Sequence, residues 1–510
     1  MPKYNVLTEP WIPIEDMQGQ AGQVGILDAL KEAHKIRCVK AASPLVSYGI
    51  QRTLIAFLID AFRPKDIDEL ADLIAKNEFD STALEQYVSL CNANGECFDL
   101  FDTKHPFMQS AIDEDVDKEK ETSFLTRLFV ELPEGNNHTH FQHKLEEDYL
   151  FTPAECAQIL CTVPSFATNI GTNAFFSING MPPLYFLYNG SNLFKTLSGS
   201  MIAQTEHSEL PLDSPPIVWR NTIKIEKGGL VAKTSLLYGL TCQPRRITLI
   251  PIELNDNVLV KEMYYAKGYN FKELPNWKDP HVAYYEGIDK KTKTIKAQEG
   301  RGVWRDLGRV IHSKYPPKFL NKIRDKLNID SDSYALIGFN TCGLIGDFKG
   351  PVYAANSWIE EGISFDIRIT ENEEKGKLFD EVLSLAEEVN KILGRTIKQS
   401  VKQLSDVQNS SKKEKGRYEN LTDQAQEIFF SKAKVFILGD FCNALANTDA
   451  SKVDWDINIK KQIGEKLKDF AQYAFYSICD CLDTSAKTLK WRAISERVFN
   501  ARINKRMKGE

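Results

Sequence analysis

Three closely spaced histidines could bind a metal ion. The stretch HTHFQH and the residues after it contain His138, His140, His143, Glu146, Glu147 and Asp148. Imidazole and carboxylate groups this close in sequence can ligate a divalent cation when the loop folds around it, as in a metal-dependent hydrolase. A metal site also needs rigid support, and the preceding Gly-Asn-Asn offers little. A solvated polar loop is therefore the favoured interpretation of this segment, called here the histidine loop.

Other catalytic signatures are absent from the sequence. It contains no nucleophile elbow, phosphate-binding loop, dinucleotide fingerprint or HExxH helix. The stretch GFNTCGLIGDFKG, residues 338–350, lacks the Lys-Ser/Thr pair that cradles a triphosphate, and its glycines predict an exposed turn or hairpin tip. The ten cysteines are scattered, and Cys479 and Cys481 lack a second pair at zinc-finger spacing. We therefore expect reduced, mostly buried thiols.

Local groups of basic residues are a stronger signal. The 510-residue chain has a formal net charge of -6, so any contact with phosphates must come from local patches. Two patches follow each other: Lys290, Lys291, Lys293 and Lys296, then Arg301, Arg305 and Arg309. The arginines would share one face of a helix and could form a phosphate-binding stripe.

The C-terminal segment is more strongly basic. Between residues 487 and 508 it has eight Lys or Arg against the single acid Glu496. Such a run is often only a solvated helix face, but an excess this large favours an anionic partner.

The apolar pattern predicts an α+β fold in two domains. Residues 43–62 have helical spacing and predict a core helix, and residues 162–370 contain short β-branched and aromatic runs that predict strands. After residue 371, four long amphipathic segments joined by polar loops predict an up-down four-helix bundle. We therefore expect a mixed, irregular N-terminal globular domain at 1–370 and a C-terminal four-helix bundle at 371–510.

No targeting or membrane segment is evident in the sequence. The N-terminus, MPKYNVLTEPWIPI, has Trp, Pro and Glu where a signal peptide needs a continuous apolar core, and we expect that no later stretch approaches the length of a membrane span. We therefore expect a cytoplasmic protein.

Four short blocks resemble a known family. They are N-x-L-x-x-x-W-I-P at residues 5–13, HPFMQ at 105–109, YGLTCQPRRITLIPIE at 238–253 and WKDPH at 277–281. Their order along the chain is similar to that in the CasA family, the large subunit of the type I-E CRISPR Cascade complex, and the resemblance covers nearly the whole chain. HPFMQ itself has no combination of residues that is typical of catalysis. We predict a structural role, with Phe107 and Met108 buried in the protein and Gln109 capping a backbone group.

The resemblance implies a non-catalytic recognition subunit without a cofactor. Family members join crRNA-containing backbone and small subunits and recognise the protospacer-adjacent motif (PAM) in double-stranded target DNA. They then insert a wedge that starts unwinding, hold the displaced strand and support recruitment of a helicase-nuclease. Because the guide RNA pairs with the target sequence, the protein needs only a short recognition step and an opening step.

The resemblance also implies roles for individual residues. Lys267 matches a lysine that enters the minor groove, near a glycine-containing loop that corresponds to Asn169, Gly171 and Asn173. The loop that contacts crRNA and neighbouring subunits corresponds to Thr139, His140, Phe141, Gln142 and His143. The wedge hairpin corresponds to Asn340, Thr341, Cys342, Gly343, Leu344 and Ile345. In the basic C-terminal helix we expect DNA contacts from Arg497, Arg502, Lys505 and Arg506.

The sequence departs from the family pattern in three places. Gly343 and Leu344 stand where the family often has a Gln at the wedge tip, and the loop at 169–173 has fewer glycines than the best-known pattern. Some relatives have clustered cysteines before the Lys267 region, but here only Cys242 is near, so we predict no zinc. Two other interpretations stay open: a metal-dependent hydrolase that uses the histidine loop, and a purely structural scaffold within a ribonucleoprotein.

Overall fold

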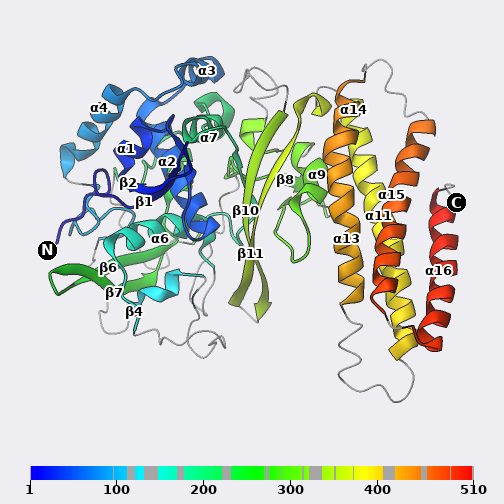
Figure 1. The fold of residues 1–510 in the computed structure, drawn as a ribbon. Helices are drawn as coiled ribbons and strands as arrows, with labels where there is room; N and C mark the ends of the chain where they lie inside the picture. Colours follow the sequence, from blue (N-terminus) through cyan, green and yellow to red (C-terminus); the bar gives the residue numbers. More distant parts are fainter. Residues whose placement is uncertain are drawn as a thin grey trace. The chain divides into compact units, whose positions relative to one another are not determined.

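The computed structural model describes most of the chain. The exceptions are residues 1, 96, 112–120, 131, 133–147, 169–176, 221–230, 232, 269, 272–273, 275, 288, 313–314, 321–335, 350–351, 371–372, 406–419, 449–456, 483 and 508–510. The chain divides into two units (Figure 1). Unit 1 comprises Met1–Gln298, Ser313–Asp332 and Gly338–Ile363, and unit 2 comprises Glu299–His312, Ser333–Ile337 and Ser364–Glu510. Unit 2 therefore takes in Glu299–His312, which the sequence prediction places in the N-terminal domain.

A buried helix, α2 (Pro44–Phe62), forms much of the core of unit 1. Pro44 lies in its first turn, where the fixed φ of proline suits a helix start. The helix packs against α6 (Pro153–Phe166), and Gly49 permits the close approach, because a Cβ there would lie 2.6 Å from the carbonyl oxygen of Cys161. The other α-helices among the described residues of the unit are α1 (Ile26–Lys31), α3 (Ile67–Ala75), α4 (Ser81–Cys91), α7 (Leu193–Ser200) and α8 (Leu236–Thr241).

Helix α2 is also long and apolar enough to cross a membrane, judged by length and composition alone. The expectation that no segment approaches such a length is therefore wrong for this helix. Because 78% of its most apolar window is buried inside the protein, α2 has the surroundings of a core helix, as the sequence predicts.

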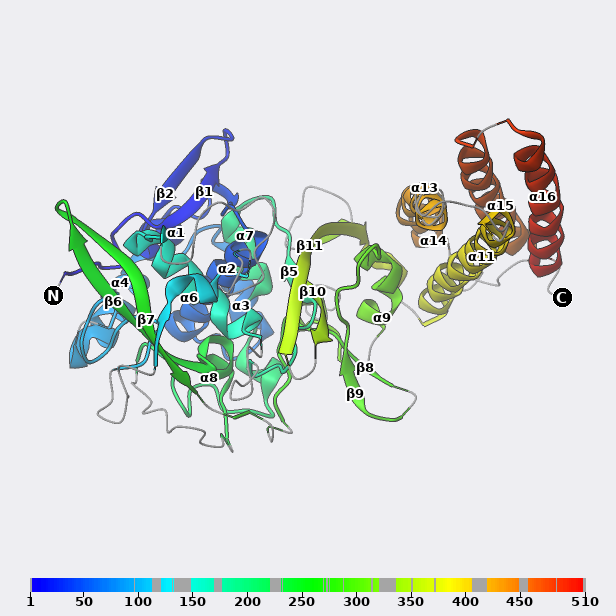
Figure 2. The same ribbon diagram turned by 90° about the horizontal axis from the view of Figure 1, so that it is seen from below.

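The strands form small antiparallel sheets. Among the described residues the strand orders are β2–β1–β3, β11–β10–β5, β4–β7–β6 and β8–β9. The strands are β1 (Ile12–Asp16), β2 (Ala21–Val24), β3 (Ile36–Val39), β4 (Thr122–Phe124), β5 (Tyr185–Tyr188), β6 (Arg245–Leu254), β7 (Asn257–Lys267), β8 (Tyr284–Glu286), β9 (Thr292–Thr294), β10 (Leu336–Lys349) and β11 (Val352–Asp366). Figure 2 shows β6 and β7 as a long two-stranded arm. The arm turns at Asn255 and Asp256, whose positive φ angles suit a two-residue hairpin.

Four long helices dominate unit 2 (Figure 1). They are α11 (Glu373–Ser405), α13 (Leu421–Val435), α15 (Ile457–Asp480) and α16 (Ala486–Met507), and the shorter α9 (Leu307–Ile311) and α14 (Cys442–Ala446) accompany them. Helix α11 packs against each of the other three long helices, and Val382, Val389 and Leu393 on its apolar face are fully buried. With its mixture of helices and small sheets, the chain has an α+β fold.

Candidate nucleic-acid interface

Lys267 stands at a tightly fixed point of the β6–β7 arm. It is the last residue of β7, lies opposite Arg245 at the start of β6, and is half-buried. A Cβ on the next residue, Gly268, would lie 2.2 Å from the carbonyl oxygen of Pro244. Only glycine fits there without a backbone shift, so the position of the Lys267 backbone is closely determined.

Arg245 is buried beside Lys267, with 1% of its surface exposed. Its Nε donates to the hydroxyl of Tyr265 over 3.0 Å, and its Nη2 donates to the carbonyl oxygen of Thr168 over 3.3 Å. Thr168 directly precedes the predicted glycine-containing loop. Arg245 therefore connects β6 with the residue that precedes that loop. Asn169, Gly171 and Asn173 themselves lie outside the described residues.

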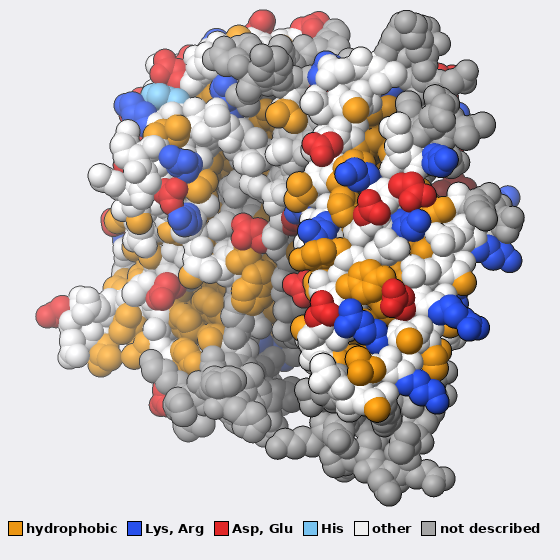
Figure 3. Space-filling model, turned by 45° about the vertical axis from the view of Figure 1, so that its right-hand side comes forward, with side chains coloured by type: hydrophobic (Ala, Val, Ile, Leu, Met, Phe, Trp, Pro, Cys, Tyr) orange, Lys and Arg blue, Asp and Glu red, His pale blue; other side chains and the backbone are white. Residues whose placement is uncertain are grey.

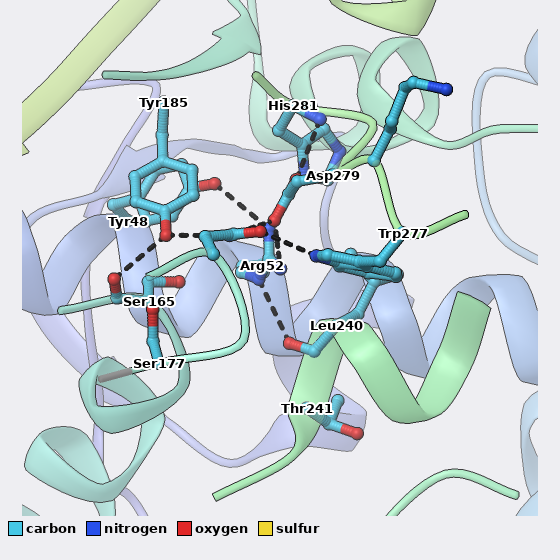
Figure 4. A network of polar contacts seen from close by, with 12 residues as sticks. Tyr48, Arg52, Ser165, Ser177, Tyr185, Leu240, Thr241, Trp277, Asp279 and His281 are labelled. Carbon is cyan, nitrogen blue, oxygen red and sulfur yellow. Dashed lines mark hydrogen bonds and ion pairs between the residues drawn. The ribbon is translucent and has the colours of Figure 1, made fainter. Parts of the chain in front are cut away.

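A buried arginine of α2, Arg52, contacts two of the sequence blocks in unit 1 (Figure 4). Arg52 of α2 donates from Nη1 and Nη2 to the two carboxylate oxygens of Asp279 over 3.0 and 2.6 Å, and from Nε to the carbonyl oxygen of Leu240 over 3.0 Å. Burial raises the pKa of Asp279, but the Arg52 guanidinium more than offsets this, so the pKa lies below its usual value. The WKDPH block therefore supplies one half of a buried ion pair.

The ion pair is the base of a wider polar network. Asn179 donates from Nδ2 to Asp279 Oδ2 over 2.7 Å and accepts from Trp277 Nε1 over 2.7 Å. The backbone N–H of Asp279 donates to the hydroxyl of Tyr284 over 2.8 Å. Both Trp277 and Tyr284 are thus held in fixed orientations by hydrogen bonds that lead back to Asp279. Figure 4 shows Trp277 beside Asp279.

The HPFMQ block is structural, as predicted. Phe107 and Met108 are each 1% exposed. Gln109 donates to the carbonyl oxygen of Leu100 over 2.7 Å and accepts from the backbone N–H of Leu249 over 2.8 Å. The amide of Gln109 therefore satisfies two buried backbone groups from different segments, which explains why this position needs both a donor and an acceptor.

The prediction of an exposed turn or hairpin tip at residues 338–350 is wrong for Asn340–Ile345, the segment assigned to the wedge. These residues lie inside β10, which pairs with β5 from Phe339 opposite Tyr188 to Cys342 opposite Tyr185. Thr341, Cys342 and Leu344 are buried. Gly343 does not have a positive φ; it allows close packing, since a Cβ would lie 2.8 Å from Cδ2 of Leu184. In its sheet, β10 lies between β5 and β11.

The basic residues of α16 are partly used within unit 2. Arg502 donates to Thr396 and Gln399 of α11 over 3.3 and 2.7 Å, and Arg506 pairs with Glu388 of the same helix at 2.6 Å. Arg497 and Lys505 are exposed. On the face of unit 2 turned forward in Figure 3, basic and acidic side chains are interspersed. Arg497 and Lys505 are therefore the better placed of the four predicted DNA contacts.

Two of the three arginines of the predicted stripe form an internal ion-pair group, whereas the third, Arg309, is exposed and lies 3.4 Å from Asp306. Arg301 donates to Asp306 and Glu387 over 2.8 and 3.0 Å, and Arg305 donates to Glu387 over 2.7 Å while lying 3.6 Å from the ring centre of Phe430. The two arginines therefore bind an acid of α11 and are not presented to phosphates, and these bonds explain why Glu299–His312 belongs to unit 2.

The histidine loop lies outside the described residues, including Thr139, His140, Phe141, Gln142 and His143. Elsewhere, within the part of the chain that the structure describes, no group of three or more His, Cys, Asp or Glu could hold a metal ion. All ten cysteines are free thiols and eight of them are buried, which confirms the prediction of mostly buried thiols.

Sequence reasoning missed Arg52 and Arg245 as organising residues. Arg52 stands in the middle of an apolar helical run, SYGIQRTLIAFLI, and an arginine in such a run signals a buried partner. Its partner Asp279 lies 227 positions away, which local patterns cannot reveal.

Comparison with known proteins identifies the family. The model of the family CRISPR-associated protein Cse1 matches residues 5–471. This chain belongs to the Cse1 (CasA) family. The CasA/Cse1 protein of Thermus thermophilus is 28% identical over 318 residues, which cover 61% of this chain and 60% of that relative. The match thus spans less than two thirds of the length of this curated relative. The family model over residues 5–471 confirms the sequence-based family prediction.

Solved structures share the fold. Cse1 from Acidimicrobium ferrooxidans matches with a TM-score of 0.74 at 16% identity, covering 100% of this chain and 99% of that chain. A chain of a CRISPR RNA-guided surveillance complex matches with a TM-score of 0.72 at 14% identity, covering 98% of this chain and 100% of that chain. The family fold therefore extends over the whole chain.

Proposed function

We propose that this chain is the non-catalytic large subunit of a type I-E CRISPR Cascade complex. The observation that carries the proposal is the Cse1 family match over residues 5–471, and the fold shared with a chain of an RNA-guided surveillance complex supports it. The proposed partners are the crRNA-containing backbone and small subunits in the cytoplasm.

In this role the chain recognises the PAM in double-stranded target DNA through Lys267. The minor-groove edge of an A·T pair presents acceptors only, so a lysine ammonium is a suitable donor there. Its fixed strand end, with Gly268 packed on Pro244 and Arg245 opposite, supports this assignment because recognition needs a donor at a defined depth.

Duplex opening is the second proposed step. Unstacking base steps costs a few kcal/mol, which phosphate contacts and guide pairing offset. Because Thr341, Cys342 and Leu344 are buried within β10, the predicted segment Asn340–Ile345 is not presented as an exposed wedge. After opening, the complex holds the displaced strand and supports recruitment of a helicase-nuclease.

The test uses the assembled complex with and without this chain. Target duplexes with randomised flanking sequence are bound at two salt concentrations and the bound fraction is sequenced. The proposal expects a flanking preference that depends on the chain. Equal binding and opening without it would reduce the chain to a scaffold.

A further inference from the structure

A pocket of about 700 Å³ in unit 1 has no role in the steps above. Three lysines and three aromatic residues line much of it: Lys278, Lys293, Lys296, Trp277, Tyr284 and Tyr285. Among the described residues, none of the side chains that line the pocket is acidic. Its size lies within the range of small-ligand sites, and its charge favours an anion.

The lysines of the pocket differ in their partners. Lys278 lies 3.5 Å from Glu209 and 4.1 Å from the ring centre of Tyr315, and Lys293 pairs with Asp289 at 3.1 Å. Lys296 donates to the sulfur of Met181 over 3.9 Å and forms no ion pair with any of the described residues. Partial burial lowers the pKa of Lys296, which indicates an ammonium that an incoming anion would stabilise.

The aromatic side of the pocket is rigid. Trp277 and Tyr284 are held by the network built on Asp279, through Asn179 and through the backbone N–H of Asp279. Tyr285 follows on β8, opposite Lys293 of β9, and is half-buried. Fixed rings beside a positive group are the combination that proteins use to bind single-stranded nucleic acid, with the base stacked and the phosphate paired.

We propose that this pocket binds one nucleotide unit, with its phosphate at Lys296 and its base against Tyr285. The proposal rests on the proposed function in one respect: the displaced DNA strand is the natural source of an unpaired nucleotide there. A free nucleotide has the same chemistry, and the test separates the two sources.

The test measures binding of a fluorescein-labelled deoxythymidine pentamer to the full-length chain by fluorescence anisotropy. Lys296→Ala is expected to weaken binding about three- to tenfold and to lower the logarithmic salt slope by about 0.7, the value for one phosphate contact on a single strand. Tyr285→Leu keeps bulk but removes the ring, and is expected to weaken binding by about fivefold or more.

Lys291→Ala is the matched control. It removes the same charge from the turn between β8 and β9, where Lys291 is exposed and outside the pocket lining, and it should leave binding within about twofold because surface charges contribute little. Equal effects of Lys291→Ala and Lys296→Ala, an inert Tyr285→Leu, or no binding of the pentamer would each overturn the proposal.

Competition identifies the source of the nucleotide. If unlabelled thymidine monophosphate displaces the pentamer at a similar concentration to an unlabelled pentamer, the pocket is a free-nucleotide site; if only the pentamer competes, it is a strand site. Both results support the proposal that the pocket binds one nucleotide unit. PAM preference is measured separately, on duplexes with the assembled complex. Failure of the pocket proposal therefore does not refute the proposed function, and failure of the proposed function does not refute the pocket.

Discussion

Removal of Arg52 tests whether the buried ion pair holds unit 1 together. The side chains of Arg52 and Asp279 are 1% and 0% exposed, and Arg52 also satisfies the carbonyl oxygen of Leu240. Arg52→Met keeps most of the apolar stem but leaves the Asp279 carboxylate buried without its cation. Loss of one partner of a buried pair costs about 3–5 kcal/mol of unfolding free energy, a drop of roughly 4–7 °C in Tm for a unit of this size.

The control is an ion pair on the surface of the same unit. Lys31 and Glu85 lie 2.6 Å apart with side chains 28% and 62% exposed, so Lys31→Met should cost no more than about 1 kcal/mol. Differential scanning calorimetry of both variants gives the comparison. A Tm for Arg52→Met within about 2 °C of the Lys31→Met value would refute the account of the network, since about 1 kcal/mol is all that a surface pair supplies.

The same pair predicts a pH dependence. The folded-state pKa of Asp279 is below its unfolded value, so its contribution to stability is complete above the unfolded pKa of about 3.9 and is lost as pH falls through the folded pKa. In Arg52→Met, burial without the cation raises the pKa of Asp279. As pH falls, Asp279 is therefore protonated at a higher pH in the variant than in the wild type, and the variant no longer carries an unpaired buried charge. The stability gap between wild type and variant should therefore narrow as pH falls, and a constant gap from about pH 7 to about pH 4 would contradict this.

Three further predictions concern other parts of the chain. Gly268→Ala should lower the unfolding free energy by about 1–3 kcal/mol because its Cβ meets the Pro244 carbonyl, whereas an unchanged Tm would show that the backbone gives way. Charge reversal at Arg497 and Lys505 should weaken DNA binding by the complex and lower the salt slope by about 0.9 for each phosphate that is no longer neutralised; unaltered affinity and slope would exclude the helix as a DNA-binding element. Metal analysis of the purified chain should find no stoichiometric metal, and zinc or manganese that disappears on triple His→Ala substitution of the histidine loop would revive the hydrolase.

Local sequence patterns predicted the helices of this protein better than they predicted its tertiary contacts. The core helix α2 and the long helices of unit 2 follow from apolar periodicity, which is a property of neighbouring residues. Gly343 shows the limit. A glycine can serve a positive φ or a close approach, and only the structure shows that this one packs against Leu184 within a strand.

The candidate site was less accessible to sequence reasoning. Basic residues predict phosphate contacts only if they lack internal partners, and Arg301 and Arg305 have one in Glu387. The Arg52–Asp279 pair likewise depends on chain segments that folding brings together. Lys267 was assigned from the family resemblance, and its DNA contact stays a prediction.

The most direct test of DNA recognition is the flanking-sequence preference of the complex containing Lys267→Ala. Lys261→Ala, a substitution of the same type on β7, is the control. We expect Lys261→Ala to keep the preference and Lys267→Ala to flatten it by about 1–3 kcal/mol per discriminated base pair, with assembly of the complex unchanged. An intact preference in the Lys267→Ala complex would contradict the central claim that this residue recognises the motif.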